Sequence, residues 1–203
     1  MVTIETYWLA VVLLLGGLPA GLSQSRLQSS PSAIHRLFME DQEDRKSMEN
    51  SAQTPSWDEW ERIAARDRQR REHVQALMVA GSLKSGRDYH DAAFIFQHGQ
   101  TPSDYLLAHI LAIAGIARGN QECRWIAAAT LDRYLQATKQ PQVFGTQYFK
   151  ANKDTPYTQE PFSPDLLSDA TRQVFCVPRL EEQKRVLDRF RNGLAPNIPR
   201  ECR

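Results

Sequence analysis

The feature that most restricts the fold of this chain is a run of three short helices in its middle, each with clear start or stop signals. The first is predicted over residues 88–98. Thr101 is a favourable N-cap for the second, and Pro102 follows at the first helical position, where its missing N–H costs nothing. Gly119 ends that helix, and Asn120 caps the third. Connections this short predict antiparallel neighbouring helices.

Two further patterns complete the helical prediction. Ser56 and Glu59 form a capping box that starts a long helix ending near Gly81, and its mixed-charge run over residues 66–72 predicts a solvated face. The body of the second short helix, residues 106–117, is apolar nearly all round, which predicts a central, buried helix.

Residues 142–161 depart from the helical pattern. The first half is rich in strand-forming residues, and Pro156 follows a polar segment suited to a turn. We therefore expect a mainly α fold: a single domain of short antiparallel helices with a small β-hairpin excursion near 142–161.

The first 23 residues are typical of a secretory signal peptide. An uncharged apolar run over residues 7–22 precedes small residues that suit a cleavage site, although Glu5 is unusual so close to the N-terminus. The chain is therefore expected to be exported, periplasmic or extracellular, with an uncleaved membrane anchor at residues 7–22 as the alternative. A flexible leader and short helix (24–55), a helical domain (56–195) and a C-terminal tail (196–203) would follow.

Composition excludes few functions. The formal net charge of +1 and the absence of a basic stripe argue against a nucleic-acid binder. Cys123, Cys176 and Cys202 allow one disulfide in an oxidising compartment, and Cys176 and Cys202 flank a predicted helix across which they could meet; buried or free thiols are the other reading. The spacing of Cys and His suggests no zinc site, and neither a metal nor a cofactor is expected.

Several short motifs lie between about Phe38 and Gln183: Asp41-Gln42-x-x-Arg45, Ala93-x-x-Phe96-Gln97-His98, Leu131-Asp132-Arg133, Gln140-x-Gln142-x-Phe144-Gly145-Thr146-Gln147-Tyr148, Asp169-x-x-Arg172 and Val177-Pro178-x-Leu180-x-x-Gln183. Through these motifs the chain resembles a bacterial domain family of unknown function. The family's usual Tyr before Gly-Thr-Gln is Phe144 here. The resemblance implies a shared fold and a shared polar cluster, but no activity.

The candidate site is a set of polar residues that helix packing alone does not require. Its members are Gln97, His98, Asp132, Arg133, Gln142, Thr146 and Gln147. Asp132 shares an apolar stripe with Ala128 and Trp125, so its carboxylate needs a buried partner, for which His98 or an arginine is the natural choice.

This set has two interpretations. In the first it lines a pocket, where Asp132 orients His98 as a base or donor, Arg133 holds an anion, and the glutamines position a ligand. In the second it is a buried network that fixes the Gly-Thr-Gln loop onto the helices. The leading functional hypothesis is an exported, non-catalytic helical module that binds a protein or small ligand. The alternative is a hydrolase-like enzyme that uses His98 and Asp132.

Overall fold

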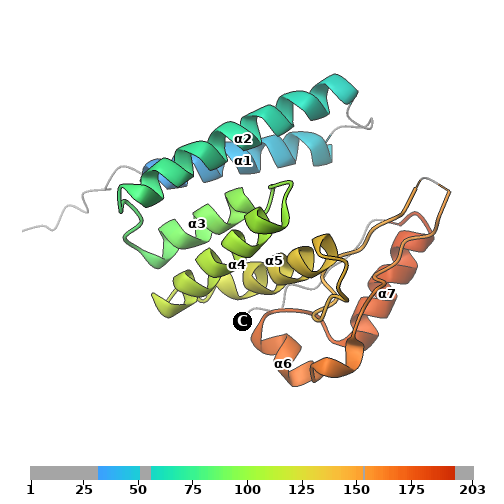
Figure 1. Ribbon diagram of the computed structural model, residues 1–203. Helices are drawn as coiled ribbons and strands as arrows, with labels where there is room; N and C mark the ends of the chain where they lie inside the picture. Colours follow the sequence, from blue (N-terminus) through green and yellow to red (C-terminus); the bar gives the residue numbers. More distant parts are fainter. Residues whose placement is uncertain (1–31, 51–55, 153, 195–203) are drawn as a thin grey trace, which may run out of the picture. The chain divides into compact units, whose positions relative to one another are not determined.

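The computed structural model describes residues 32–50, 56–152 and 154–194 (Figure 1). The predicted signal peptide, residues 24–31 and 51–55 of the predicted leader and short helix, and the predicted C-terminal tail lie outside these residues. The described part is mainly helical, as the sequence predicts. None of its helices is both long and apolar enough to cross a membrane.

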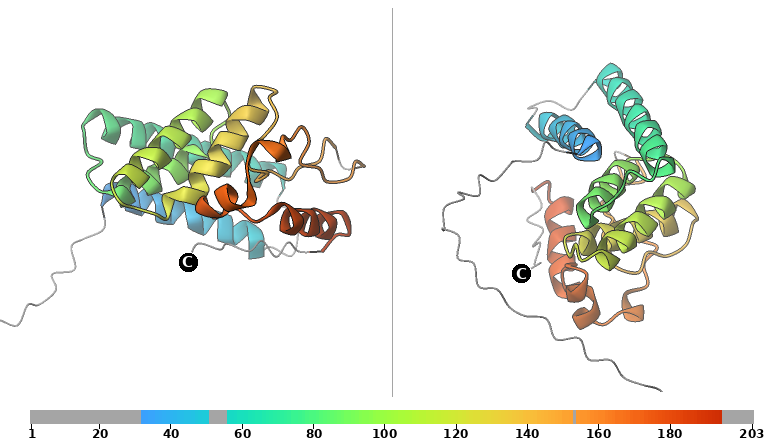
Figure 2. Two further views of the ribbon diagram at one scale, coloured as in Figure 1. Left: turned by 90° about the horizontal axis from the view of Figure 1, so that it is seen from below. Right: turned by 90° about the vertical axis from the view of Figure 1, so that its left-hand side faces the viewer.

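The predicted trio of helices forms the centre of the fold as α3 (Gly86–Phe96), α4 (Pro102–Ala117) and α5 (Cys123–Ala137). The three lie side by side, with α4 packed against both of the others (Figure 2). The predicted N-cap Thr101 is confirmed: its side chain accepts a hydrogen bond from the backbone N–H of Asp104, whose carboxylate bonds back to it. These local signals fix the start of α4 within its own first turn.

Small residues let the trio pack closely. A Cβ added to Gly115 of α4 would lie 2.4 Å from the sulfur of Cys123, and one added to Gly86 would lie 2.8 Å from the Cβ of Asn120. Cys123 is itself a buried, free thiol. The helix axes therefore approach more closely than larger side chains would permit.

α4 is central, as predicted, because it lies between α3 and α5, but the prediction that it is buried is wrong on one side. Leu106, Ile110 and Ile113 lie on one side of α4 and are 36%, 53% and 43% exposed, respectively. The buried helix is α5, where all residues from Ile126 to Thr130 are at most 1% exposed. Hydropathy alone could not show that α5 is more buried than α4. Residues 142–147 cover a second side of α5, and their packing depends on polar side chains.

Two longer helices, α1 (Ala33–Asn50) and α2 (Trp57–Val79), run alongside one another beside the trio (Figure 1). The capping box at Ser56 is confirmed. α1 packs mainly on α3 and buries Ile34 in the core, which makes it a layer of the helical unit. The prediction of a solvated 66–72 run fails for Asp67 and Arg70, which are 7% and 5% exposed because they pair with charged residues of α1.

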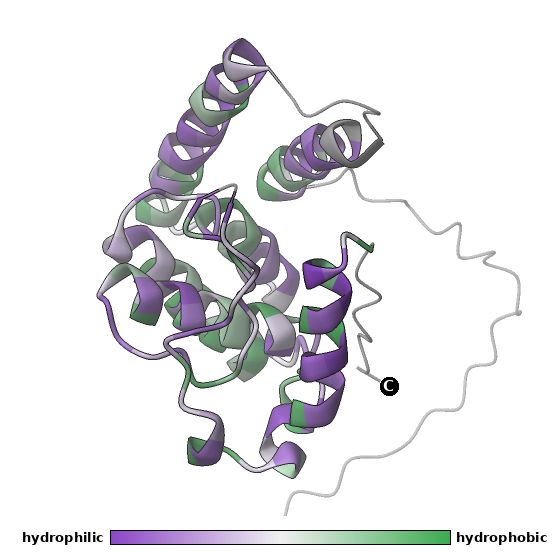
Figure 3. Cartoon of the chain, turned by 90° about the vertical axis from the view of Figure 1, so that its right-hand side faces the viewer, coloured by the Kyte–Doolittle hydropathy of each residue, from purple (hydrophilic) through white to green (hydrophobic). Residues whose placement is uncertain are grey.

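The rest of the chain wraps from the end of α5 to the C-terminal helices. It contains a short 3-10 turn, η1 (Pro164–Leu166), followed by α6 (Asp169–Val174) and α7 (Leu180–Arg191). α7 is polar on its outer side (Figure 3) and buries Gln183 and Val186 on the other. Near its end, the ring of Phe190 lies 5.2 Å from that of Tyr148.

The expected β-hairpin is reduced to isolated bridges. Phe149 and Thr158 pair in antiparallel fashion through two backbone hydrogen bonds, of 3.0 and 2.9 Å, and Gln142 forms a parallel bridge with Phe162. No regular strands follow in the described part of this segment, because side-chain amides and a carboxylate occupy the backbone groups that a strand ladder would use. Of the other cysteines, Cys176 is disulfide-bonded, and Cys202 lies outside the described residues.

Candidate functional site

Asp132 fixes the loop that carries the Gly-Thr-Gln motif. Its carboxylate is fully buried on α5. One oxygen accepts hydrogen bonds from the backbone N–H groups of Val143 (2.8 Å) and Phe144 (3.0 Å), and the other accepts from the backbone N–H and the hydroxyl of Thr146 (2.9 and 2.8 Å). These four donors satisfy the carboxylate, which has no cationic partner at hydrogen-bonding distance among the described residues.

Buried glutamines complete the same loop. Gln142 accepts from the backbone N–H of Gln147 and donates to its carbonyl, both at 3.0 Å, and it also donates to the carbonyl of Gln159. Gln147 in turn donates to the carbonyl of Ala129 on α5, at 3.2 Å. Each amide supplies a donor and an acceptor at once, which is why glutamine suits a loop whose backbone cannot form a ladder.

Gly145 and Gln183 make the tightest point of this arrangement. Gly145 has φ +81°, and an added Cβ would lie 2.0 Å from Oε1 of Gln183. Gln183 is 1% exposed and donates to the carbonyls of Phe144 and Pro178, at 2.9 and 2.8 Å. The loop is therefore held from α5 on one side and from α7 on the other.

Gln97 and His98 belong to a different cluster. They follow α3, and His98 Nε2 accepts a hydrogen bond from Arg45 Nε (3.3 Å) and lies 3.6 Å from Asp41 Oδ2. Arg45 also donates to Asp67, at 2.7 Å. The predicted set thus divides: Asp132, Gln142, Thr146 and Gln147 meet around the loop, whereas His98 bonds to Arg45 of α1 and Arg71 of α2. No hydrogen bond links His98 to Asp132, both of which the structure describes.

Burial and neighbouring cations set the ionisation of the His98 cluster. Burial, reinforced by Arg45 and then Arg133, lowers the pKa of His98 from 6.5 to about 3. Burial raises the pKa of Asp41 from 3.8 to about 6, against the opposing effect of Arg45. At neutral pH, His98 is therefore neutral and Asp41 is largely ionised.

These pKa shifts predict that acid changes the stability of the fold in opposite directions through His98 and through Asp41. A neutral His98 contributes stability above pH 6.5 that is lost as pH falls toward 3, since the unfolded chain binds the proton more readily. Asp41 favours the protonated form in the fold, so its contribution is present below pH 3.8 and is lost as pH rises through 6. The stability contributions of His98 and Asp41 therefore change in opposite directions as the pH falls.

We therefore compare each variant with itself at pH 7 and pH 4. Relative to wild type, His98→Asn should lose less unfolding free energy on acidification and Asp41→Asn should lose more, each by about 1–2 kcal/mol. Urea unfolding at the two pH values measures both. Equal pH dependence in all three proteins would contradict the assigned shifts.

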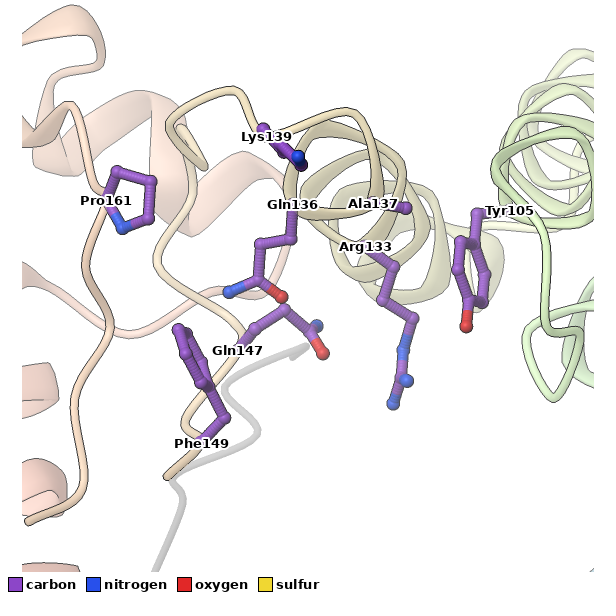
Figure 4. Close-up of a pocket in the computed structure, with 8 residues that line it drawn as sticks. All are labelled: Tyr105, Arg133, Gln136, Ala137, Lys139, Gln147, Phe149 and Pro161. Carbon is purple, nitrogen blue, oxygen red and sulfur yellow. The ribbon is translucent and has the colours of Figure 1, made fainter. Parts of the chain in front are cut away.

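Arg133 lines a pocket of about 500 Å³ between α4, α5 and the loop (Figure 4). The other lining residues are Tyr105, Gln136, Ala137, Lys139, Gln147, Phe149 and Pro161. Arg133 and Gln136 are three residues apart on α5, so their side chains share one face of the helix. The lining contains two cationic side chains and no acidic one.

Two buried donors in this pocket lack partners. Arg133 Nε and Gln136 Nε2 make no hydrogen bond to any described residue. Arg172 Nε is also unpaired, but the terminal nitrogens of Arg172 donate to the carbonyls of Leu167 and Pro164. Arg133, in contrast, forms neither a hydrogen bond nor an ion pair within the described part of the chain. Burial lowers the pKa of its guanidinium, as does the charge of Arg45.

The candidate set omitted part of this pocket. Gln136, three residues after Arg133, was detectable from helical spacing once Arg133 was chosen. Tyr105, Lys139 and Phe149 come from separate elements, and no local sequence signal relates them to one another. Comparison of the chain with models of known protein families, with characterised proteins and with solved structures gives no match.

Proposed function

We propose that this protein is an exported, non-catalytic helical module that binds a small organic anion in the Arg133 pocket. The observation that carries the proposal is the pair of unpartnered buried donors, Arg133 Nε and Gln136 Nε2, on the wall of that pocket. A buried donor without a partner costs about 1–3 kcal/mol, and more if it is charged, so an acceptor supplied by a ligand recovers that energy.

The lining supports this chemistry. Arg133 and Lys139 provide positive charge without a compensating carboxylate, while Tyr105 and Phe149 provide aromatic surface for an apolar body. A volume of about 500 Å³ lies within the range of small-molecule sites. The ligand class is therefore a compact molecule with a carboxylate or phosphate group and a ring or short chain.

Binding is favoured over the hydrolase alternative, because the two residues that a hydrolase would use, His98 and Asp132, are already engaged in other contacts. The Asp132 carboxylate already accepts four hydrogen bonds from the loop. His98 Nε2 accepts from Arg45, and its lowered pKa makes it a weak base at neutral pH.

The test is to measure the binding of benzoate and of phenyl phosphate by calorimetry and by shifts in NMR spectra. We expect one or both to bind wild type, and Arg133→Gln to weaken that binding about 10- to 100-fold, because a charge-assisted hydrogen bond is worth about 1.5–3 kcal/mol. Since Arg133 has no hydrogen-bond or ion-pair partner among the described residues, the variant should retain the wild-type melting temperature.

The matched control is Arg185→Gln, which removes an arginine from α7 that is 70% exposed. It should bind both probes as wild type does. Benzamide, which lacks the charge of benzoate, should bind much more weakly. Failure of both anions to bind, or equal binding by wild type and Arg133→Gln, would refute the proposed function.

A further inference from the structure

Arg133 also lines a second, smaller pocket of about 250 Å³. Gln97 and His98 lie on the wall of this pocket, together with Trp60. A ligand seated on the Arg133 guanidinium therefore lies at the boundary of two cavities, and the smaller one is lined by the motif Gln97-His98. The hydrogen bonds between Asp132 and the loop do not explain the role of that motif.

The contact with Arg45 determines which nitrogen of His98 carries the proton. Arg45 Nε–H only donates, so His98 Nε2, at 3.3 Å, must be the acceptor. In a neutral imidazole the proton then resides on Nδ1. Within the described residues, Nδ1 has no hydrogen-bond partner, and the side chain is 23% exposed. His98 therefore has a free N–H donor.

The charged groups around the ring keep it neutral. Asp41 and Arg45 face it from α1, Arg70 and Arg71 act on it from α2, and Arg133 acts on it from α5. Four of these five groups are cations, which disfavour a second proton on the ring, and burial acts in the same direction.

We propose that His98 donates its Nδ1–H to a neutral acceptor oxygen of the ligand whose anionic group is bound by Arg133. Arg45 is then a positioning residue, because its Nε–H fixes the tautomer of His98. This inference rests on the proposed function and narrows the ligand class to an acid that carries an amide or similar carbonyl close to its charged group, the chemistry of an N-acyl amino acid.

Hippurate and benzoate form the probe pair, since hippurate has an amide between its ring and its carboxylate and benzoate has none. In wild type, hippurate should bind about three- to tenfold more tightly than benzoate, as expected for one neutral hydrogen bond. His98→Ala should abolish this preference and leave benzoate affinity unchanged. His98→Asn, whose side-chain amide can place an N–H near the position of Nδ1, should restore much of the preference.

The outcomes separate the two proposals. Loss of benzoate and hippurate binding together, in wild type, overturns the proposed function. Arg133-dependent benzoate binding without a hippurate preference, or with a preference that His98→Ala retains, overturns only the role of His98. Melting temperatures of both His98 variants confirm that the comparison is made on folded protein.

A second measurement needs no ligand. Proton–nitrogen correlation spectra of the histidine rings, at pH 7, should show His98 protonated on Nδ1 alone and should show no titration between pH 8 and pH 5. Protonation of Nε2, or a charged ring at pH 7, would contradict the proposed donor.

Discussion

Replacing Asp132 with alanine is expected to lower the free energy of unfolding by about 3–5 kcal/mol, the largest effect of any single substitution considered for this protein. The change removes the acceptor for three backbone N–H groups and one hydroxyl at once. Those donors remain buried, and residues 143–146 lose their attachment to α5. For a chain of this size the melting temperature should fall by about 10 °C or more.

Thermal and urea unfolding, followed by circular dichroism, measure this effect. Asp188→Ala is the matched control, because that carboxylate is 67% exposed on α7 and should contribute less than about 1 kcal/mol. Thr146→Ala should fall between the two, since it removes only the side-chain hydroxyl donor of the four. An Asp132→Ala protein as stable as wild type would show that the loop does not depend on this carboxylate.

Gly145→Ala is expected to cost about 2–5 kcal/mol for two separable reasons. A side chain at φ +81° is strained, which accounts for about 1–2 kcal/mol. The new Cβ would also lie 2.0 Å from Gln183 Oε1, and Gln183 cannot withdraw without breaking its hydrogen bonds to Phe144 and Pro178. Overpacking of this kind adds about 1–3 kcal/mol.

Gly193→Ala separates the two contributions. Gly193 has φ +68°, but no atom of the described residues lies within 4 Å of the added Cβ, so only the backbone strain should remain. The double variant Gly145→Ala with Gln183→Ala should cost less than the sum of the single changes, because the clash disappears with the Gln183 side chain. Equal unfolding free energies for Gly145→Ala and Gly193→Ala would contradict the close contact.

The helical framework was predictable because its signals are local. Ser56 and Thr101 act as caps within their own first turn, and such contacts do not depend on distant residues. The exposure of α4 was not predictable, since an apolar helix can lie at the centre or the edge of a bundle. Nor was the burial of Asp67 and Arg70, which depends on Arg45 and Asp44 of α1 lying opposite them.

The candidate site was predicted in part for a related reason. Asp132 stood out as a carboxylate on an apolar stripe, and the resemblance associated it with Gln142 and Thr146, which do meet it or its loop. The sequence makes His98 or an arginine the natural partner of Asp132, because a buried carboxylate needs one. The structure gives His98 and Asp132 different partners, and no rule of spacing identifies which of several buried charges pair across helices.

We expect the guanidinium of Arg133 to bind an anion that is supplied from outside the protein. The most direct measurement is the proton–nitrogen resonance of Arg133 Nε, assigned by its loss in Arg133→Gln and followed during a titration with benzoate. We predict a saturable shift of this resonance, with the Nε resonance of Arg185 unchanged. A resonance that stays in place while benzoate binds elsewhere, or that is already hydrogen-bonded within the free protein, would contradict it.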